Sequence, residues 1–483
     1  MKISENWLRT WVNPAVDSNT LSDQLTMLGL EVDDLSPAAK PFTGVVVGEV
    51  LTVEQHPDAD RLRVTTVNIG SGDSLQIVCG APNVRVGMKA PVATIGAVLP
   101  GDFKIKKGKL RGIESQGMLC GASEIDLEDK IDGLLELAVD APVGVDIREY
   151  LQLDDHVIDI SITPNRGDCF SIRGIAREIG VINQLTVTAP EINAVAATIA
   201  DEKKVVVSTE GCPRYLGRVI KNVNTKAATP EWMERALVRS GIRQHSILVD
   251  ITNYVLMELG QPLHAFDAAK IQGSVQVRQA NTAEKLVLLN EQEVELNEKV
   301  MVIADDEKAL AIAGIMGGLS SSVTDETQDI FLESAFFAPL AIAGRARSFG
   351  LHTDASQRYE RGVDFELPML AMHRASQLIA ELAGGEFGPI TTAEQAAVLP
   401  KREAIELEQA QVDQLLGYRV DAAFIADALT RLGCAVTVKA EGQWSVVPPS
   451  HRYDMAIYQD LIEEVARIHG YDNIQISLPK IEA

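Results

Sequence analysis

The sequence predicts an α+β protein of several domains, in which a small β-barrel is inserted into a small helical/β N-terminal domain. At 483 residues the chain is too long for one hydrophobic core, and about one domain per 150 residues gives three or four domains. Residues 42–150 contain short β-branched runs separated by turn residues, which is typical of a small closed barrel. Helical spacing of apolar residues precedes and follows this stretch, so the barrel is expected to interrupt a helical region.

Two helices are expected to flank the β-rich stretch. Leu21, Leu25 and Leu28 recur at helical spacing near the start of the chain. After the β-rich stretch, Asp168 can cap a second helix, and Gly180 is a natural stop for it. Both helices are therefore expected to belong to the one domain that the barrel splits.

Two further boundaries divide the rest of the chain. An alanine-rich connector at 189–204 precedes a large mixed α/β region. Near 399–409 a second boundary is expected, after which helical and strand patterns alternate up to a helix at about 455–469. The expected domains are a split N-terminal helical/β domain (1–41 and 151–190), the barrel (42–150), a mixed α/β domain (204–398) and a small α/β domain with an acidic helix (399–476).

Composition excludes several classes of protein. The formal net charge of −24 argues against a general nucleic-acid binder, because phosphate contacts need clustered Lys and Arg. The five cysteines are scattered and form no zinc-binding pattern, so buried reduced thiols are expected. No apolar run approaches the roughly 18 residues of a membrane span, and the first residues lack the apolar stretch of a signal peptide, which predicts a cytoplasmic protein.

Three segments carry the strongest functional signal. They are DITNYVLMELGQPLHAFD at 250–267, AIAGIMGGLSSSVTDET at 311–327 and LESAFFAPLAIAGRARSFGLHTDASQRYERGVD at 332–364. The last one places apolar runs around charged residues such as Glu333, which a plain structural segment rarely does. In this order the segments resemble the editing region of bacterial phenylalanyl-tRNA synthetase beta subunits, and the resemblance implies that residues 204–398 form an editing domain.

A site that edits tyrosine must recognise the para-hydroxyl that phenylalanine lacks. An apolar pocket rejects an isostere with one extra hydroxyl by only about a hundredfold, so a second, hydrolytic site is the usual remedy. A carboxylate in an apolar pocket can accept the phenol's hydrogen bond, and Glu333, flanked by Leu332 and Phe336, is the residue expected to do so. The alternative is a structural Glu333 paired with an arginine. The candidate partners are Arg345, Arg347, Arg358 and Arg361.

The resemblance also implies further residues of the editing pocket. They are Arg243, Thr252, Asn253, His264, Gly317, Thr353 and Ala355. Gly317 would let the backbone approach the substrate closely, because it has no Cβ. His264 can recognise the tRNA end or orient water, and positioning is favoured over proton transfer. Neither a Ser-His-Asp order nor a metal cluster is evident here, and ester hydrolysis needs only a placed water and an oriented carbonyl.

The barrel region resembles the OB-type tRNA-binding domain of several synthetases. The matching motifs are HPDADRL (56–62), IVCGAPNVRVG (77–87) and GIESQGMLCGASE (112–124). Between residues 42 and 125 only Phe42 and Phe103 are aromatic, so backbone contacts are expected in place of base stacking. We expect weak, salt-sensitive tRNA contact, with packing against neighbouring domains as the alternative. The candidate contact residues are Arg61, Arg63, Lys104, Lys106, Lys107, Lys109 and Arg111.

Four acidic residues mark the last predicted helix. They are Asp454, Asp460, Glu463 and Glu464, of which the last three lie at i, i+3 and i+4 and so share one helix face. Spacing alone favours a helix cap and a solvated face. The segment HRYDMAIYQDLIEEVARIHGYDN nevertheless resembles the family's motif for Mg²⁺ shared with the alpha subunit's ATP site, which implies oxygen ligands for magnesium, through water.

The resemblance implies a function in translation. It identifies the chain as the N-terminal portion of a phenylalanyl-tRNA synthetase beta subunit, without the family's C-terminal catalytic-like and anticodon-binding domains. Such a subunit binds phenylalanine tRNA, forms a heterotetramer of two alpha and two beta chains, supports ATP-dependent attachment of phenylalanine by alpha, and hydrolyses mischarged tyrosyl-tRNA. A non-catalytic tRNA-binding scaffold and a free-standing deacylase acting in trans are the alternatives.

Overall fold

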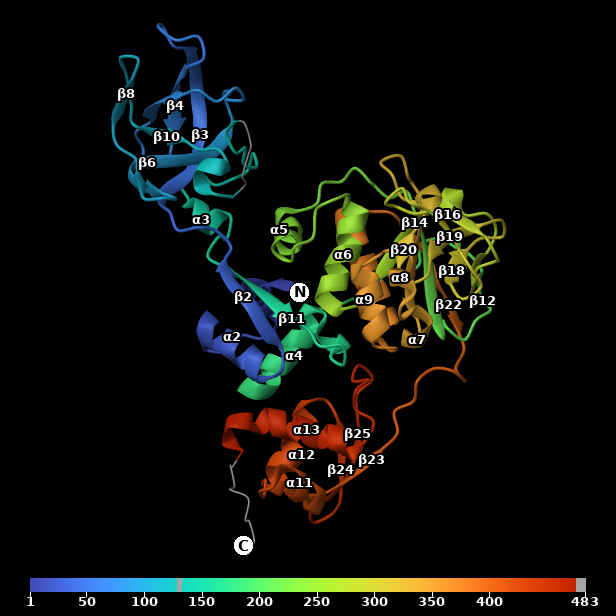
Figure 1. Ribbon diagram of the computed structural model, residues 1–483. Helices are drawn as coiled ribbons and strands as arrows, with labels where there is room; N and C mark the ends of the chain where they lie inside the picture. Colours follow the sequence, from blue (N-terminus) through green and yellow to red (C-terminus); the bar gives the residue numbers. More distant parts are fainter. Residues whose placement is uncertain (128–132, 475–483) are drawn as a thin grey trace. The chain divides into compact units, whose positions relative to one another are not determined.

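The computed structural model describes residues 1–127 and 133–474 (Figure 1). Two of the expected domains, 42–150 and 399–476, therefore include a few residues outside the described ranges. In the described part of the chain, no helix has both the length and the apolar character needed to cross a bilayer. By its internal contacts the chain divides into two units, which are Ser36–Val157 and the combination of Met1–Leu35 with Ile158–Ala483.

The unit Ser36–Val157 is rich in β-strands. Its elements are β3 (Thr43–Gln55), β4 (Arg63–Asn68), β5 (Leu75–Cys79), β6 (Lys89–Leu99), β7 (Phe103–Lys104), β8 (Gly108–Leu110), β9 (Ile113–Ser115), β10 (Gly117–Leu119), η1 (Ser123–Ile125) and α3 (Ile147–Tyr150). The main sheet has the order β10-β6-β3-β4-β5 with β7 added to β6, and β8 pairs with β9. Alternate residues of β3, such as Val45 and Val47, are buried, because only one face of the strand meets the core.

The pairing in this unit is that of an open sheet whose end strands approach each other. The backbone N–H of Gln116 donates to the carbonyl of Gln76 at 2.8 Å, and Ser115 Oγ accepts from Val78 N–H at 3.1 Å. Among the described residues, however, no ladder joins β10 to β5. The closed barrel expected from the sequence is therefore not found, since β10 is only three residues long and leaves its outer edge without a partner strand.

The first part of the other unit combines three strands with three helices. Its elements are β1 (Lys2–Ser4), α1 (Glu5–Trp11), α2 (Ser18–Met27), β2 (Glu31–Pro37), β11 (His156–Ser161), η2 (Gly167–Cys169) and α4 (Ile172–Asn183), and the sheet order is β1-β11-β2. Two sequence expectations for α4 are wrong. Ser171, not Asp168, caps the helix by accepting from the N–H of Gly174 at 3.0 Å, and the helix continues past Gly180 to end at Gln184 in the left-handed conformation.

The segment from residue 204 to 398 contains two main sheets. Its strands are β12 (Val205–Val207), β13 (Arg214–Lys221), β14 (Leu263–Asp267), β15 (Val275–Gln279), β16 (Lys285–Val287), β17 (Glu293–Glu295), β18 (Met301–Ala304), β19 (Ala309–Ile312), β20 (Met316–Gly317), β21 (Ile330–Phe336) and β22 (Glu386–Glu394). They form the sheets β14-β21-β13-β22 and β12-β15-β18-β19-β20, with β16 and β17 as a separate pair. The helical elements are α5 (Glu231–Arg239), α6 (Ile247–Leu259), η3 (Ala268–Lys270), η4 (Leu319–Ser321), α7 (Pro339–Ile342), α8 (Arg345–Ser348), α9 (Asp354–Arg361) and α10 (Leu367–Leu382).

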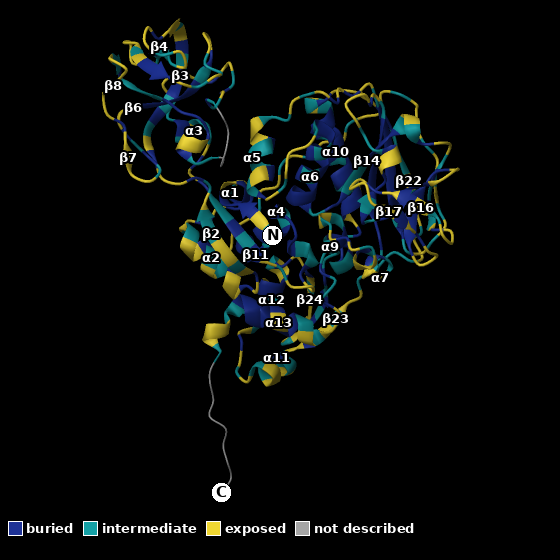
Figure 2. Cartoon of the chain, turned by 45° about the horizontal axis from the view of Figure 1, so that its top comes forward, coloured by how far each residue is buried: buried dark blue, intermediate teal, exposed yellow. Residues whose placement is uncertain are grey.

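Both faces of the sheet β14-β21-β13-β22 are buried. On one face, Leu216, Ile330 and Leu332 join a core that includes apolar residues of α4, α6 and α10, which we call the helix-side core. On the other face, Tyr215 and Phe331 join a core built with β15, β18 and β19, the strand-side core. Successive strand residues point to opposite faces, so every residue of β21 is buried. Figure 2 accordingly shows α6 almost entirely in the colour of buried residues.

The C-terminal part forms a small α/β arrangement. Its elements are β23 (Ile405–Glu408), α11 (Gln409–Leu416), α12 (Ala422–Arg431), β24 (Ala435–Ala440), β25 (Gln443–Val447), α13 (Tyr458–His469) and η5 (Tyr471–Asn473), and the sheet order is β23-β25-β24. One face of α13 is buried through Leu461, Ile462 and Val465. The acidic helix predicted at about 455–469 thus begins three residues later than expected.

A buried network of ion pairs connects α13 to α4. Arg467 of α13 pairs with Glu178 of α4 and with Glu464, and Glu178 also accepts from Arg166 at 2.7 Å. Although burial disfavours its charge, the neighbouring Arg166 holds the pKa of Asp168 well below its usual range. Buried charges are tolerated only when they are paired in this way, so the network fixes how the two helices meet.

Candidate functional site

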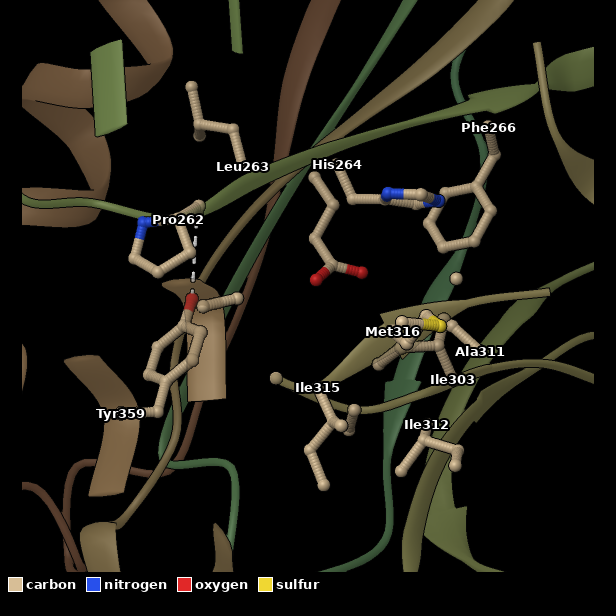
Figure 3. A pocket seen from close by; sticks show the side chains of 15 residues that line it. Pro262, Leu263, His264, Phe266, Ile303, Ala311, Ile312, Ile315, Met316 and Tyr359 are labelled. Atoms are coloured by element: carbon tan, nitrogen blue, oxygen red, sulfur yellow. Dashed lines mark hydrogen bonds between the residues drawn. The ribbon is translucent and has the colours of Figure 1, made fainter. Parts of the chain in front are cut away.

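A cavity of about 80 Å³ lies against the strand-side core, beside β14, β19, β20, β21 and α9. Figure 3 shows His264 on one side of this cavity and Met316 on the facing side. Most of the lining side chains are apolar, whereas Glu333 and Tyr359 contribute oxygen atoms. The lining residues are Pro262, Leu263, His264, Phe266, Ile303, Ala311, Ile312, Ala313, Gly314, Ile315, Met316, Gly317, Glu333, Ala355 and Tyr359.

Glu333 is a buried carboxylate on β21 that faces this cavity. Glu333 is 7% exposed, and its side chain points to the same face of the sheet as Phe331. Its Oε2 accepts a hydrogen bond from the hydroxyl of Tyr215 at 2.7 Å. In the described residues no arginine pairs with it, and Arg358 instead binds Asp354 at 3.0 Å. The alternative of an ion-paired structural Glu333 is therefore wrong.

The environment of Glu333 changes its protonation. Burial raises the pKa of its carboxyl group to about 7, and the hydrogen bond from Tyr215 opposes this effect without cancelling it. The residue therefore titrates close to neutral pH, unlike an exposed glutamate. Perturbation of this kind in a cavity is a common property of functional sites.

Tyr215 is a site residue that the sequence did not reveal. It lies on β13 and is separated from Glu333 by 118 positions in the chain. In the strand register, Tyr215 is opposite Ala335 and Gly217 is opposite Glu333, so Tyr215 and Glu333 are diagonal neighbours. The sequence signal was the β-branched and aromatic run RYLGRVI at 214–220, which indicates a strand but not its partner.

His264 lies directly beside Glu333 on the neighbouring strand. The two residues are register partners between β14 and β21, and the His264 ring packs edge-on against Phe266 with centroids 4.4 Å apart. Burial lowers the pKa of His264 to about 4, so its ring is neutral at neutral pH. Its Nε2 is buried and has no hydrogen-bond partner among the described residues, which leaves one polar atom available to a ligand.

Gly317 is required by the His264 ring. A Cβ at position 317 would lie 2.5 Å from Cε1 and 2.7 Å from Nε2 of His264, closer than any real side chain allows. The sequence predicted that Gly317 makes room for a substrate, and the structure shows that it also makes room for the ring of His264. Its missing side chain first of all allows the ring of His264 to approach β20 closely.

Thr353 and Ala355 begin helix α9 at the edge of the cavity. Thr353 caps the helix by accepting from Ser356 N–H at 3.1 Å, and its hydroxyl donates to the carbonyl of Ile315 at 2.9 Å. Ala355 lines the cavity one residue into the helix. One turn later the hydroxyl of Tyr359 donates to the carbonyl of Ala335 at 3.0 Å. Thr353 therefore holds the wall of the cavity without lining it.

The remaining three predicted pocket residues lie on α6 or just before it. Arg243 is exposed in the segment that precedes the helix. Thr252 is buried and donates its hydroxyl to the carbonyl of Val249 at 2.8 Å, and Asn253 is half-buried. None of the three lines the cavity. The structure thus brings together Glu333, His264, Gly317 and Ala355, with Thr353 behind them, and leaves the α6 residues outside.

The predicted tRNA-contact residues lie on the unit Ser36–Val157. All are exposed except Arg63, which is half-buried and donates to the carbonyl of Asp60 at 3.0 Å. Lys107 forms an ion pair with Glu114 at 2.7 Å, so one of the positive charges is partly neutralised. Phe103, 59% exposed, lies in the same run. Its strand, with Lys104 and neighbouring residues, borders a cavity of about 520 Å³. The residues concerned are Arg61, Arg63, Lys104, Lys106, Lys107, Lys109 and Arg111.

The four predicted magnesium ligands do not converge. Arg452 binds Asp454 at 2.7 and 2.9 Å and Glu464 at 2.7 Å, and Asp460 caps α13 by accepting two backbone N–H bonds. Burial disfavours the charge of Glu464, but Arg452 and Arg467 outweigh this and lower its pKa to about 2. Among the described residues, the only three potential ligands close enough to share an ion are Asp168, Cys169 and Glu178, where Arg166 already lies. Of the four, only Glu463 is exposed without a hydrogen bond or ion pair to another residue that the structure describes.

Three family models match consecutive parts of the chain. Residues 45–146 match the model described as "Putative tRNA binding domain", residues 211–384 match the B3/4 domain, and residues 405–471 match the tRNA synthetase B5 domain. These matches place the chain in the class of multidomain tRNA synthetase subunits.

Relatives identify the family within this class. The chain is 80% identical over 482 residues to the phenylalanine-tRNA ligase beta subunit of Acinetobacter baylyi, and 60% identical over 489 residues to that of Psychrobacter arcticus. It belongs to the family of phenylalanine-tRNA ligase beta subunits. Each match covers 100% of this chain and 61% of the relative, so the chain spans about three fifths of their length.

A solved structure gives only a weak likeness. The N-terminal fragment of the phenylalanyl-tRNA synthetase beta subunit from Pyrococcus horikoshii is 12% identical, with 97% of this chain and 99% of that chain covered. Its TM-score of 0.40 adds no weight to the family assignment.

Replacing Glu333 by Gln should change the pH dependence of stability. The folded-state pKa of about 7 lies above the usual 4.5, so the wild-type protein loses stability as pH rises from about 4.5 to 7, by up to about 3 kcal/mol. Glu333→Gln has no such loss, and its unfolding midpoint relative to wild type should increase between pH 5 and pH 8. The control is Glu463→Gln, which removes an exposed carboxylate. A difference between Glu333→Gln and wild type that does not change with pH would contradict the raised pKa.

Proposed function

We propose that this chain hydrolyses tyrosyl-tRNA formed by mischarging of phenylalanine tRNA, as the editing part of a phenylalanine-tRNA ligase beta subunit. One observation carries the proposal: Glu333 faces a cavity lined mostly by apolar side chains, with one carboxylate oxygen held by Tyr215 and the other without a partner in the described part of the chain. A tyrosine hydroxyl can donate to that free oxygen. Phenylalanine offers no such donor, so its ester gains nothing from Glu333.

The cavity must widen to admit an aromatic ring. About 80 Å³ is less than the roughly 150 Å³ of a cavity that binds benzene. Met316 lies on the wall that faces His264 and is half-buried, and its unbranched side chain adapts more readily than a β-branched one. We therefore place the entry of the ring on the Met316 side.

Hydrolysis in this site requires positioning more than acid-base chemistry. A neutral His264 with a pKa of about 4 is a weak base at neutral pH, but its unpartnered Nε2 can hold a water molecule or a polar group of the tRNA end. Because the ester bond of an aminoacyl-tRNA is already reactive, holding the water molecule and the ester carbonyl in the right geometry supplies most of what hydrolysis requires. Thr353 and Ala355 shape the wall through α9, and Arg243, Thr252 and Asn253 are proposed to contact the tRNA end from outside the cavity.

The editing proposal is tested by hydrolysis of tyrosyl-tRNA against phenylalanyl-tRNA, both charged on phenylalanine tRNA. At pH 8, where Glu333 is ionised, Glu333→Ala should lower the ratio of kcat/KM for the tyrosyl over the phenylalanyl ester by roughly tenfold or more, because a hydrogen bond to a charged group contributes about 1.5–3 kcal/mol. Glu307→Ala is a matched control at an exposed position of the same segment that does not line the cavity. Unchanged selectivity in Glu333→Ala would sink the assignment. Absence of hydrolysis by the wild type would mean either that editing needs the alpha subunit to present the tRNA or that the chain is a non-catalytic scaffold.

We further propose that residues 42–150 form an OB-type tRNA-binding domain, flanked by a split domain of residues 1–41 and 151–190. Replacing Lys106, Lys107 and Lys109 by Glu should weaken tRNA binding by about tenfold at low salt and make the salt dependence less steep by about 2 in log-log slope. A control with the same charge change outside this unit is Lys285, Lys299 and Lys308 to Glu. Equal affinities of the two triple variants would support packing as the role of the basic run.

A larger assembly is also proposed. The relatives are named beta subunits, so we infer that the intact protein joins an alpha subunit, in a complex of two alpha and two beta chains, and supports ATP-dependent attachment of phenylalanine. Residues 204–398 are then the editing domain and 399–476 the small domain that carries α13.

Magnesium fits the acidic helix only in a restricted way. Because Asp454, Asp460 and Glu464 are engaged within the protein, Glu463 is the residue we propose to reach an ion, through water and together with groups of the alpha subunit. In the assembled enzyme, Glu463→Gln should weaken magnesium binding measured by titration, whereas Glu360→Gln, at a half-buried position of α9, should not. Equal binding by both variants would remove magnesium from this helix.

A further inference from the structure

Tyr215 is fixed in place by strand pairing and by burial. It lies on β13, which is paired on one side with β21 and on the other with β22, and its side chain is fully buried in the strand-side core. Its backbone register places it opposite Ala335 and Ala393. A tyrosine on a central strand has little freedom to turn, so its hydroxyl occupies a defined point next to the cavity.

The hydroxyl of Tyr215 can reach Glu333 because the residue opposite Glu333 on β13, Gly217, has no side chain. Gly217 stands directly opposite Glu333, and a Cβ at this position would lie 2.1 Å from the ring of Phe331. A side chain at 217 is thereby excluded, and the diagonal contact between Tyr215 and Glu333 replaces a direct cross-strand one. The hydroxyl then donates to Oε2 of Glu333 at 2.7 Å, a short hydrogen bond.

We infer that Tyr215 is a positioning residue for substrate recognition: its hydroxyl holds Oε2 of Glu333, so that Oε1 alone faces the cavity and accepts the hydrogen bond of a ligand's phenolic hydroxyl. This inference rests on the proposed editing function. Without Tyr215 both oxygens would be free to rotate, and the cavity would offer its acceptor at no fixed place. The carboxylate of Glu333 thus accepts two hydrogen bonds, one from the hydroxyl of Tyr215 and one from the hydroxyl of the ligand.

The hydrogen bond between Tyr215 and Glu333 also influences the pH at which the site binds a phenolic hydroxyl. The titratable groups around Glu333 are Cys212 and Tyr215 from the β13 side, His264 from β14 and Tyr359 from α9, and all four are uncharged at neutral pH. Burial raises the pKa of Glu333, and the hydrogen bond from Tyr215 is the effect that opposes it. An ionised Glu333 accepts the phenolic proton donor best, so selectivity is present above this pKa and is lost as pH falls through it.

The test is a comparison of Tyr215→Phe with Tyr359→Phe. Each change removes one buried hydroxyl and keeps the ring, but the hydroxyl of Tyr359 donates to backbone carbonyls of Pro262 and Ala335 and not to Glu333. The ratio of kcat/KM for tyrosyl- over phenylalanyl-tRNA is measured from pH 5.5 to 9. In Tyr215→Phe the midpoint of this profile should move up by roughly one pH unit, and selectivity at pH 7 should fall several-fold. In Tyr359→Phe the midpoint should remain near that of the wild type.

A second measurement separates the inference from the proposed function. In Tyr215→Phe the pH-dependent loss of stability assigned to Glu333 should extend above pH 7, and combining it with Glu333→Gln should abolish this shift. A wild-type enzyme without tyrosine selectivity at any pH would overturn the editing function. A selective wild type whose pH profile and stability curve both coincide with those of Tyr215→Phe would overturn the role of Tyr215 alone.

Discussion

Burial of both faces of the sheet β14-β21-β13-β22 is the constraint on which the site depends. Helices α4, α6 and α10 cover one face and the strands β15, β18 and β19 cover the other, so the side chains of β21 are buried, and Glu333 is the β21 residue that borders the cavity. A charged residue in such a strand is costly unless a partner or a ligand compensates it. Glu333 has one neutral partner, Tyr215, and one open side, and both its raised pKa and its availability to a ligand follow from this arrangement.

The pKa values of Glu333 and His264, which both line the cavity, are shifted by the same physical effect in opposite directions. Burial disfavours charge, which raises the pKa of Glu333 to about 7 and lowers that of His264 to about 4. At neutral pH the site therefore presents a neutral imidazole next to a carboxyl group near its midpoint. Recognition of a hydroxyl and placement of water are functions that such a pair can serve without a metal ligand or a nucleophilic side chain.

Sequence reasoning succeeded for α13, because the spacing of its apolar residues is a local property. The resemblance indicated Glu333 and His264, and the structure places both beside one cavity, while their role in editing stays a prediction. Sequence reasoning failed where groups compete for partners across the fold. Asp168 has the residue type of a helix cap, yet it binds Arg166, and Ser171 caps α4 in its place. Helical spacing likewise put Glu464 on a face with other acids, whereas buried arginines draw its carboxylate inward.

The sequence by itself determined where apolar and charged residues lie along the chain and, from their spacing, the approximate extent of the helices and strands. Its motifs also indicated the family that the chain resembles. Only the tertiary structure decided which strands are neighbours, and therefore that Tyr215 meets Glu333 and that Gly317 makes room for the ring of His264. Alternation along a strand fixes which face a side chain takes, but the register between strands far apart in the chain depends on how the whole core packs. Protonation depends on that packing too, because desolvation is a property of the surroundings and not of the residue.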